Sequence, residues 1–408
     1  MVGLRNALEI TLALAVASCN VPDSSPSTGG VDVPNGPCGR GVVVIESDYS
    51  STNVALVGFN GATYSGSFLS SGSLSPGISM ALSGDVVAPL ERPSSSIVLL
   101  DRYPNAVLTW ADPVTAGVTA QLSVAAGFAS NPHDYLDVGD GKAYVSRYGS
   151  NPSPGKQPWD QGGDLLVLQS NPPSIRGRID LRQPDDGDLL PRPDRMIRLG
   201  SSVAVLLQRF DATFSRAGDG RVVGIDPSAD RIAWRIDLTG FASCGAVARS
   251  PSGATWIVVC SGTFQDGAAQ LQRSGIAVFD ATSEPPLEIR RYDAATRLGA
   301  PLAPAIGYAS ETLVVGVAYG NLDAPTGDRL FSLDLASGEV TTLLETSEPF
   351  VLGEVRCARE CGEPCLVADA QSRGLRVWRA TESGVMQQEA MVGLSDGVGL
   401  PPRSLGGF

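Results

Sequence analysis

The sequence predicts an all-β fold, a β-propeller built from seven four-stranded blades. Three observations lead to this class: a β-rich pattern that recurs about every 55 residues, further strand pairs between the repeats, and no long window with the apolar periodicity of a helix. Two hairpins per period make four strands, which is one propeller blade. A β-solenoid would need a shorter repeat, and a β-sandwich would not repeat.

Seven similar segments define the repeat. Each is a β-rich run that ends near an acidic or polar residue, followed by a short turn and a returning strand. The strand ends Ile225-Asp226, Phe279-Asp280 and Leu333-Asp334 show the pattern most clearly. We interpret the segments as the outer hairpins of seven blades. They are residues 41–60, 96–112, 163–181, 220–238, 274–293, 328–346 and 373–392.

Inner strand pairs lie between the outer hairpins, separated by turns rich in Gly, Ser and Asp. Only six such pairs are visible, and we expect residues 394–408 to return and complete the blade that residues 41–60 begin. This closure would place both ends of the chain in one sheet and remove exposed sheet edges. The inner pairs are residues 80–89, 136–148, 196–210, 244–260, 305–319 and 351–370.

One repeat carries a recognisable motif. Residues 143–147, reading AYVSR, follow a Gly141-Lys142 turn, and this segment resembles the YVTN family of β-propeller repeat proteins of bacterial surfaces. Ser146 and Arg147 stand where the family has Thr and Asn. The resemblance covers residues 41–393 as architecture but a single repeat as motif. It implies a fold and a setting, and it says little about activity.

The amino end has the pattern of an export signal. A polar start containing Arg5 is followed by an apolar run over residues 10–18, which as a helix would span about 14 Å, far less than the roughly 30 Å of a bilayer core. Val16-Ala17-Ser18-Cys19 resembles the bacterial lipobox, which implies cleavage after residue 18 and lipid on Cys19. The alternative is an ordinary signal peptide with a structural cysteine nearby. Asn20 after the cysteine favours the outer membrane.

Residues 19–40 are predicted to be a flexible tether, because they are rich in Pro, Ser, Gly and Asp and nearly free of large apolar side chains. The propeller would then occupy residues 41–408. The formal net charge is −13, without a basic stripe, which argues against nucleic-acid binding. The expected setting is an exported protein attached to a lipid membrane through acylated Cys19, with envelope proteins or glycans as partners.

The six remaining cysteines are an even number, which in an exported chain indicates disulfides. Cys244 and Cys260 flank a turn almost symmetrically, so they are predicted to pair. Three cysteines cluster further along the chain, and one of them is left for Cys38, which would tie the amino end to the last full blade. The spacing of the cluster matches neither zinc nor iron–sulfur sites. Its members are Cys357, Cys361 and Cys365.

The single histidine, His133, limits the available chemistry. Sites with several histidine ligands are excluded by count, and no C-x-x-C-H haem motif occurs. The composition favours a turn capped by Asn and Asp that exposes His133. The alternative is that loops entering an innermost strand line a mouth of the channel and contact a ligand. The candidate contact residues are Asn131, His133, Asp134, Arg147 and Tyr148.

Two further features have competing interpretations. Trp159 lies in an irregular insertion and is a better candidate contact residue than the other four tryptophans, which lie in predicted strands and are interpreted as packing. The acidic loops at residues 137–141 and 185–188 could hold structural Ca²⁺, but neither has EF-hand spacing, and solvated turns are favoured. No catalytic residue, metal ligand or cofactor is otherwise indicated.

The leading hypothesis is therefore a binding or scaffold propeller, anchored at the cell envelope and without evident catalysis. The alternative is a lactonase-like hydrolase built around the propeller channel, in the periplasm or at the cell surface. A third class is a structural subunit of an envelope complex. Polar side chains converging in the channel would favour the hydrolase, and an apolar or blocked channel would argue against it.

Overall fold

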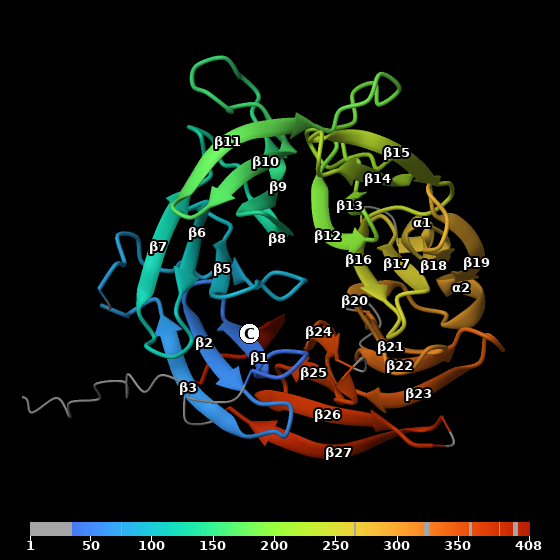
Figure 1. The fold of residues 1–408 in the computed structure, drawn as a ribbon. Helices are drawn as coiled ribbons and strands as arrows, with labels where there is room; N and C mark the ends of the chain where they lie inside the picture. Colours follow the sequence, from blue (N-terminus) through green and yellow to red (C-terminus); the bar gives the residue numbers. More distant parts are fainter. Residues whose placement is uncertain are drawn as a thin grey trace, which may run out of the picture.

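The computed structural model describes residues 35–408, except residues 75, 265–266, 322–325, 359–360, 383 and 395–398. The described chain forms seven four-stranded antiparallel sheets arranged in a ring (Figure 1). This arrangement confirms the predicted seven-bladed β-propeller. The predicted signal peptide, Cys19 and most of the predicted tether lie outside the described residues.

The seven blades follow one another along the chain, each with its innermost strand named first. The first three blades are β28 (Pro402–Gly407), β1 (Val42–Ser47), β2 (Thr52–Val57) and β3 (Thr63–Ser70); β4 (Val86–Val87), β5 (Ile97–Asp101), β6 (Val107–Ala111) and β7 (Val118–Ser123); and β8 (Pro132–Gly139), β9 (Lys142–Ser150), β10 (Gly162–Ser170) and β11 (Pro173–Asp180).

In the remaining four blades, as in the second and third, the strands follow sequence order from the innermost to the outermost. They are β12 (Pro193–Leu199), β13 (Ser202–Leu207), β14 (Gly220–Asp226) and β15 (Arg231–Leu238); β16 (Cys244–Arg249), β17 (Thr255–Ser261), β18 (Ser274–Asp280) and β19 (Leu287–Asp293); β20 (Leu302–Tyr308), β21 (Leu313–Ala318), β22 (Arg329–Asp334) and β23 (Val340–Glu345); and β24 (Leu352–Cys357), β25 (Cys365–Asp369), β26 (Gly374–Ala380) and β27 (Met386–Gly393).

Two short helices, α1 (Gly267–Gln272) and α2 (Ala294–Arg297), are the helices found in the described part of the chain. Neither is long and apolar enough to cross a membrane.

The ring closes where the two ends of the described chain meet. β28 pairs antiparallel with β1, with Val44 opposite Leu405, so the last residues complete the first blade as expected. A disulfide between Cys38 and Cys361 adds a covalent link from the amino end to the loop between β24 and β25 in the seventh blade. Each blade remains a separate four-stranded sheet, so this closure joins the two ends of the described chain within one blade and does not remove the outer sheet edges, contrary to the expectation from the sequence.

The cysteines pair in three disulfides. The predicted bond between Cys244 and Cys260 is present, and the three clustered cysteines divide so that Cys361 bonds to Cys38 while Cys357 bonds to Cys365. Cys357 and Cys365 lie opposite each other in neighbouring strands, which leaves Cys361, in the connecting loop, free to reach the amino end.

The strand assignment within the first two blades differs from the sequence prediction. Residues 41–60 and 96–112 are the two middle strands of their blades, not the outer hairpins, and the outer strands are β3 and β7. The predicted inner pair at residues 80–89 contains only the two-residue strand β4. The outer strands were missed because they have exposed, polar faces with few large apolar residues, and the middle strands carry the continuous apolar runs.

Burial follows this division between middle and outer strands. β1 and β2 are buried along their whole length because neighbouring blades cover both faces. Outer strand β15 instead alternates, with Trp234 and Leu238 buried and Arg231 exposed. The core therefore lies between adjacent blades, and the innermost strands are left to line the central channel.

Candidate functional site

The central channel contains two cavities, one at each end of the innermost strands. The cavity at the strand starts, which we call the upper cup, has a volume of about 410 Å³ and is lined on β12 by Asp194. The cavity at the strand ends, the lower cup, has a volume of about 290 Å³ and is lined on the same strand by Ile197. Arg195 and Glu354 line both cavities, so they lie between them.

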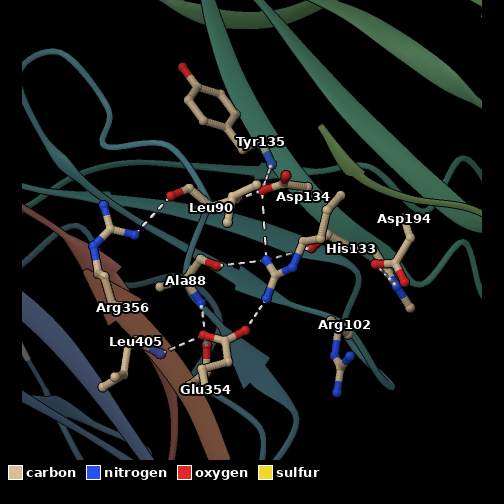
Figure 2. A network of polar contacts seen from close by, with 12 residues as sticks. Ala88, Leu90, Arg102, His133, Asp134, Tyr135, Asp194, Glu354, Arg356 and Leu405 are labelled. Atoms are coloured by element: carbon tan, nitrogen blue, oxygen red, sulfur yellow. Dashed lines mark hydrogen bonds and ion pairs between the residues drawn. The ribbon is translucent and has the colours of Figure 1, made fainter. Parts of the chain in front are cut away.

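Arg195 and Glu354 form an ion pair that makes the floor of the upper cup. Nη1 of Arg195 also donates to the carbonyls of Ala88 at 3.0 Å and His133 at 3.4 Å. Oε2 of Glu354 accepts hydrogen bonds from Ser404 Oγ at 2.9 Å and from the Leu405 amide at 2.6 Å (Figure 2). The floor therefore connects blade 4 to blade 7 and to the ring-closing strand β28.

Asp134 is fully buried beside this floor and is not part of either cavity wall. Its Oδ1 accepts from the amides of Leu90 and Tyr135, and its Oδ2 accepts from the amide of Met196 at 2.8 Å (Figure 2). Burial raises the pKa of Asp134 to about 7, although Arg195 and the three amide donors favour its carboxylate form. Asp134 thus ties three blades together and is not placed to contact a ligand.

His133 lies in the wall of the upper cup, near the start of β8, with 13% of its side chain exposed. Its Nδ1 is 2.9 Å from Oδ1 of Asp194, and its ring stacks on Tyr148 with centroids 4.3 Å apart. The turn with an exposed histidine, which the local composition favoured, is therefore wrong. The neighbouring blade buries His133, and local sequence carries no sign of that.

The protonation of this pair follows from its surroundings. Burial lowers the pKa of His133, although the carboxylate of Asp194 opposes the shift. Burial acts to raise the pKa of Asp194, but His133, Arg195 and Gln208 outweigh it and lower the pKa. At neutral pH the pair is a neutral imidazole whose Nδ1–H donates to an ionised carboxylate. The other ring nitrogen, Nε2, has no hydrogen-bond partner among the described residues.

Tyr148 supports the pair from behind. Its hydroxyl donates to Oε1 of Gln208 at 3.0 Å, and Nε2 of Gln208 donates to Asp194. Burial raises the pKa of the Tyr148 hydroxyl, so it remains a donor at neutral pH. Tyr148 is therefore part of the site, as a residue that positions Gln208 and stacks on His133.

Arg147 has a structural environment outside both cups. Its side chain is fully buried, and its Nε and Nη2 each lie 2.8 Å from a carboxylate oxygen of Asp164. Nη2 also donates to the carbonyl of Trp159, a half-buried residue that packs against the core between blades 2 and 3.

Asn131 adopts a left-handed backbone with φ of 48°, and its buried Oδ1 has no partner. Arg147, Trp159 and Asn131 do not line the upper cup.

Aromatic side chains surround the mouth of the upper cup. Tyr49 and Phe350 are 67% and 41% exposed, and Phe350 packs on Tyr319 with ring centroids 5.0 Å apart. The guanidinium of Arg403 lies over the Tyr49 ring at 5.2 Å and donates to the Phe350 carbonyl. Sequence reasoning missed these residues, since they come from loops of different blades.

Asp194, Arg195 and Glu354 were also missed. The sequence signal that could have identified them is a charged residue among the apolar residues of an innermost strand, such as Arg195 before Met196 and Ile197. A charge at such a position must find a partner across the channel, because leaving it unpaired in the interior is costly.

The acidic loops proposed for Ca²⁺ have other partners in the structure. Asp185 pairs with Arg221 and Arg235, and Asp137 accepts from the Tyr135 hydroxyl at 2.6 Å. Within the described ranges, no group of three or more His, Cys, Asp or Glu side chains could hold a metal ion.

The sheet topology defines the chain as a seven-bladed β-propeller. No protein-family model matches the sequence, and no curated protein matches it. The structure resembles a protein from Lactobacillus plantarum at 10% identity and TM-score 0.57, covering 90% of this chain and 98% of that chain.

Two further solved structures are similar. A hypothetical selenium-binding protein from Sulfolobus tokodaii matches at 10% identity and TM-score 0.54, covering 89% of this chain and 92% of that chain. Kuenenia stuttgartiensis hydrazine synthase matches at 12% identity and TM-score 0.51, covering 75% and 80%. Likeness at this identity shows the fold alone.

Proposed function

We propose that this chain is an exported binding module, held at the cell envelope by lipid on Cys19, whose ligand enters the upper cup. The observation that carries the binding role is the floor formed by Arg195 and Glu354, which makes the channel a cup with one open end. Its volume of about 410 Å³ lies within the range typical of ligand sites, roughly 300–1,000 Å³.

Binding is favoured over covalent catalysis by the partners of His133. A nucleophilic hydrolase needs a Ser, Thr or Cys within hydrogen-bond reach of its base. In the described part of the chain, the hydrogen-bond partner of the His133 ring is Asp194, and no hydroxyl or thiol bonds to the ring. Ser404, a serine of the cup wall, donates to Glu354 instead.

Export is supported by the three disulfides, since such bonds form and persist in oxidising compartments. Attachment to the outer membrane is inferred from residues 16–20, where a lipobox-like sequence precedes Asn20. Lipid on Cys19 would hold the propeller in the periplasm or at the cell surface, joined to the membrane through residues 19–40.

The anchor is tested by fractionating cells that express the full chain. Wild type should sediment with membranes and require detergent for release, and Cys19→Ala should appear in the soluble exported fraction. Cys38→Ser, which removes a disulfide cysteine close in sequence, is the matched control and should stay with the membrane. Membrane retention of Cys19→Ala would refute the anchor without affecting the fold.

The binding role is tested by photo-crosslinking in intact cells. A benzophenone amino acid at Tyr49, on the rim of the upper cup, should give a discrete adduct. The same group at Ile289, an exposed residue of outer strand β19, should not. Absence of any adduct from Tyr49, with the protein folded and exported, would contradict a ligand at this site.

A second candidate is hydrolysis of a lactone or ester by water activated at Nε2 of His133. The observation that favours it is the His133–Asp194 pair, in which a carboxylate holds a neutral imidazole with Nε2 available as a general base. Purified protein should then hydrolyse a panel of γ- and δ-lactones, with a loss of about 10²-fold or more in His133→Asn. Equal rates for both proteins would exclude this candidate.

A further inference from the structure

The upper cup combines paired charges with an aromatic rim, and together these features indicate the chemical class of its ligand. The inference rests on the proposed binding function, because it concerns what occupies the same cup. The relevant features are the charge balance of the wall, the hydrogen-bonding groups left for a ligand, and the rings at the mouth.

The charged groups of the cup wall sum to zero. Arg102 pairs with Asp85, and Arg195 pairs with Glu354. With His133 neutral, one negative charge remains on Asp194. It is balanced by Arg403, whose hydrogen bonds go to backbone carbonyls and which has no carboxylate within 4 Å among the described residues.

A wall of this kind is matched best by a ligand without net charge. An anion would enter a cavity that already contains the carboxylates of Asp85, Asp194 and Glu354, and a cation would meet Arg403 at the aromatic rim. Either would add an unbalanced charge to a partly dehydrated cavity, which is unfavourable.

The wall of the upper cup offers both hydrogen-bond acceptors and a hydrogen-bond donor to a ligand. Nε2 of neutral His133 accepts, the Asp194 carboxylate accepts, and the Arg403 guanidinium donates. A hydroxyl group both donates and accepts, so a ligand bearing several hydroxyls can satisfy all three side chains. This mixture of donors and acceptors is characteristic of sites for polyhydroxylated ligands.

The rim supplies flat apolar surfaces above this polar wall. Tyr49 and Phe350 are large rings with 67% and 41% of their surface in water, and Tyr319 supports Phe350 from the side. Exposed rings gathered at a cavity mouth mark a contact surface. The C–H face of a pyranose ring is apolar and flat, and it packs on such rings while its hydroxyls point sideways.

We propose that the upper cup binds the uncharged end of a glycan chain. A pyranose ring lies against Phe350 and Tyr49 at the mouth, and the hydroxyls of the terminal sugar reach Asp194, His133 and Arg403. Arg195 and Glu354 limit how far the chain enters. The floor and the wall thus favour recognition of a chain end over the middle of a chain.

The test is isothermal titration of the purified full chain with neutral and charged probes of similar length. The neutral probes are chitotetraose, cellotetraose and maltotetraose, the acidic probe is tetragalacturonic acid, and the peptide probe is tetra-alanine. At least one neutral tetrasaccharide should bind.

Three variants locate the binding. A side chain at Gly245 would project toward Asp194 and Gln208, since a Cβ there lies 3.0 Å from each, so Gly245→Met should fill the cup and weaken binding at least about tenfold. Tyr49→Ala and Phe350→Ala should each weaken it about two- to tenfold. Ile289→Ala, on the outside of blade 5, is the control and should bind as wild type.

Each outcome decides the inference. If Gly245→Met does not fold, the rim variants Tyr49→Ala and Phe350→Ala alone locate the binding site. Binding of tetra-alanine or tetragalacturonic acid in place of every neutral sugar, with loss in the rim variants, would overturn the saccharide assignment and leave the cup as a binding site. Sugar binding that survives in the rim variants would overturn the location. Failure of every probe, together with no crosslink from Tyr49, would remove both proposals.

Discussion

Arg195 and Glu354 form an ion pair across the central channel, although 159 positions separate them in the sequence. The pair joins the innermost strands of blades 4 and 7, which are not neighbours in the ring. Glu354 also accepts from Ser404 and Leu405 of the ring-closing strand. The centre of this propeller is therefore held by side chains as well as by packing between adjacent blades.

Removing one partner of this pair should destabilise the protein more than removing both. Arg195→Met leaves Glu354 and Asp134 largely buried without their cation, at a cost of about 2–4 kcal/mol in the free energy of unfolding. Arg195→Met combined with Glu354→Leu should recover part of the loss. Urea denaturation measures both. A double variant that is less stable than Arg195→Met would contradict this account.

The link between the amino end and blade 7 should contribute through the unfolded state. The Cys38–Cys361 bond spans 323 positions, so breaking it releases a long closed loop, with an expected cost of about 2–5 kcal/mol. Cys38→Ala with Cys361→Ala should stay folded, because β28 still pairs with β1. Cys357→Ala with Cys365→Ala, which opens a separation of only 8 positions, should cost less in the same assay.

The fold was predictable from the sequence because its main signals are local. Middle strands buried on both faces leave apolar runs such as residues 42–45, and turns between them recur at a nearly regular interval. Local pairing also allowed Cys244 and Cys260 to be matched across one hairpin. The register of the first two blades failed where that signal weakens, in the exposed outer strands β3 and β7.

The candidate site was less predictable, since it is assembled from distant segments. His133 and Tyr148 were identified from one hairpin, but Asp194 is 61 positions from His133 and Glu354 lies in the last blade. Asp134 and Arg147 have the polarity of ligand contacts, yet they are buried structural residues. Only the placement of neighbouring blades distinguishes a charge that faces a cavity from one that ties strands together.

The stability of the protein should depend on pH through Glu46, a fully buried residue of β1. Its Oε1 accepts from Asn53, its Oε2 has no partner, and burial raises its pKa from 4.5 to about 7. Between these two values the folded state holds a proton that the unfolded state releases. Stability therefore falls as pH rises from 4.5 to 7, by at most about 3 kcal/mol.

Glu46→Gln removes this titration and isolates its contribution. The variant and wild type should have similar free energies of unfolding at pH 4.5, and the variant should be more stable at pH 8. Asp134 titrates in the same direction, but it is present in both proteins and cancels in the difference. Parallel pH profiles for the two proteins would show that the Glu46 pKa is not raised.

Arg147 should matter for stability and not for ligand binding. Its guanidinium forms a bidentate ion pair with the buried carboxylate of Asp164, and Nε of Arg178 lies 3.0 Å from the same carboxylate. Arg147→Met should lower the free energy of unfolding by about 2–4 kcal/mol, with Arg178 limiting the loss. Arg147→Lys should lose less, because it keeps the charge without the planar fork.

The same two variants distinguish the structural role from a role in recognition. Folded Arg147→Lys should bind the upper-cup ligand with unchanged affinity, since Arg147 contacts Asp164 and the Trp159 carbonyl and lies outside the cup wall. Titration of the variant beside His133→Asn, which should bind more weakly, supplies the comparison. A loss of affinity in Arg147→Lys at unchanged stability would mean that the ligand reaches the loop around Trp159.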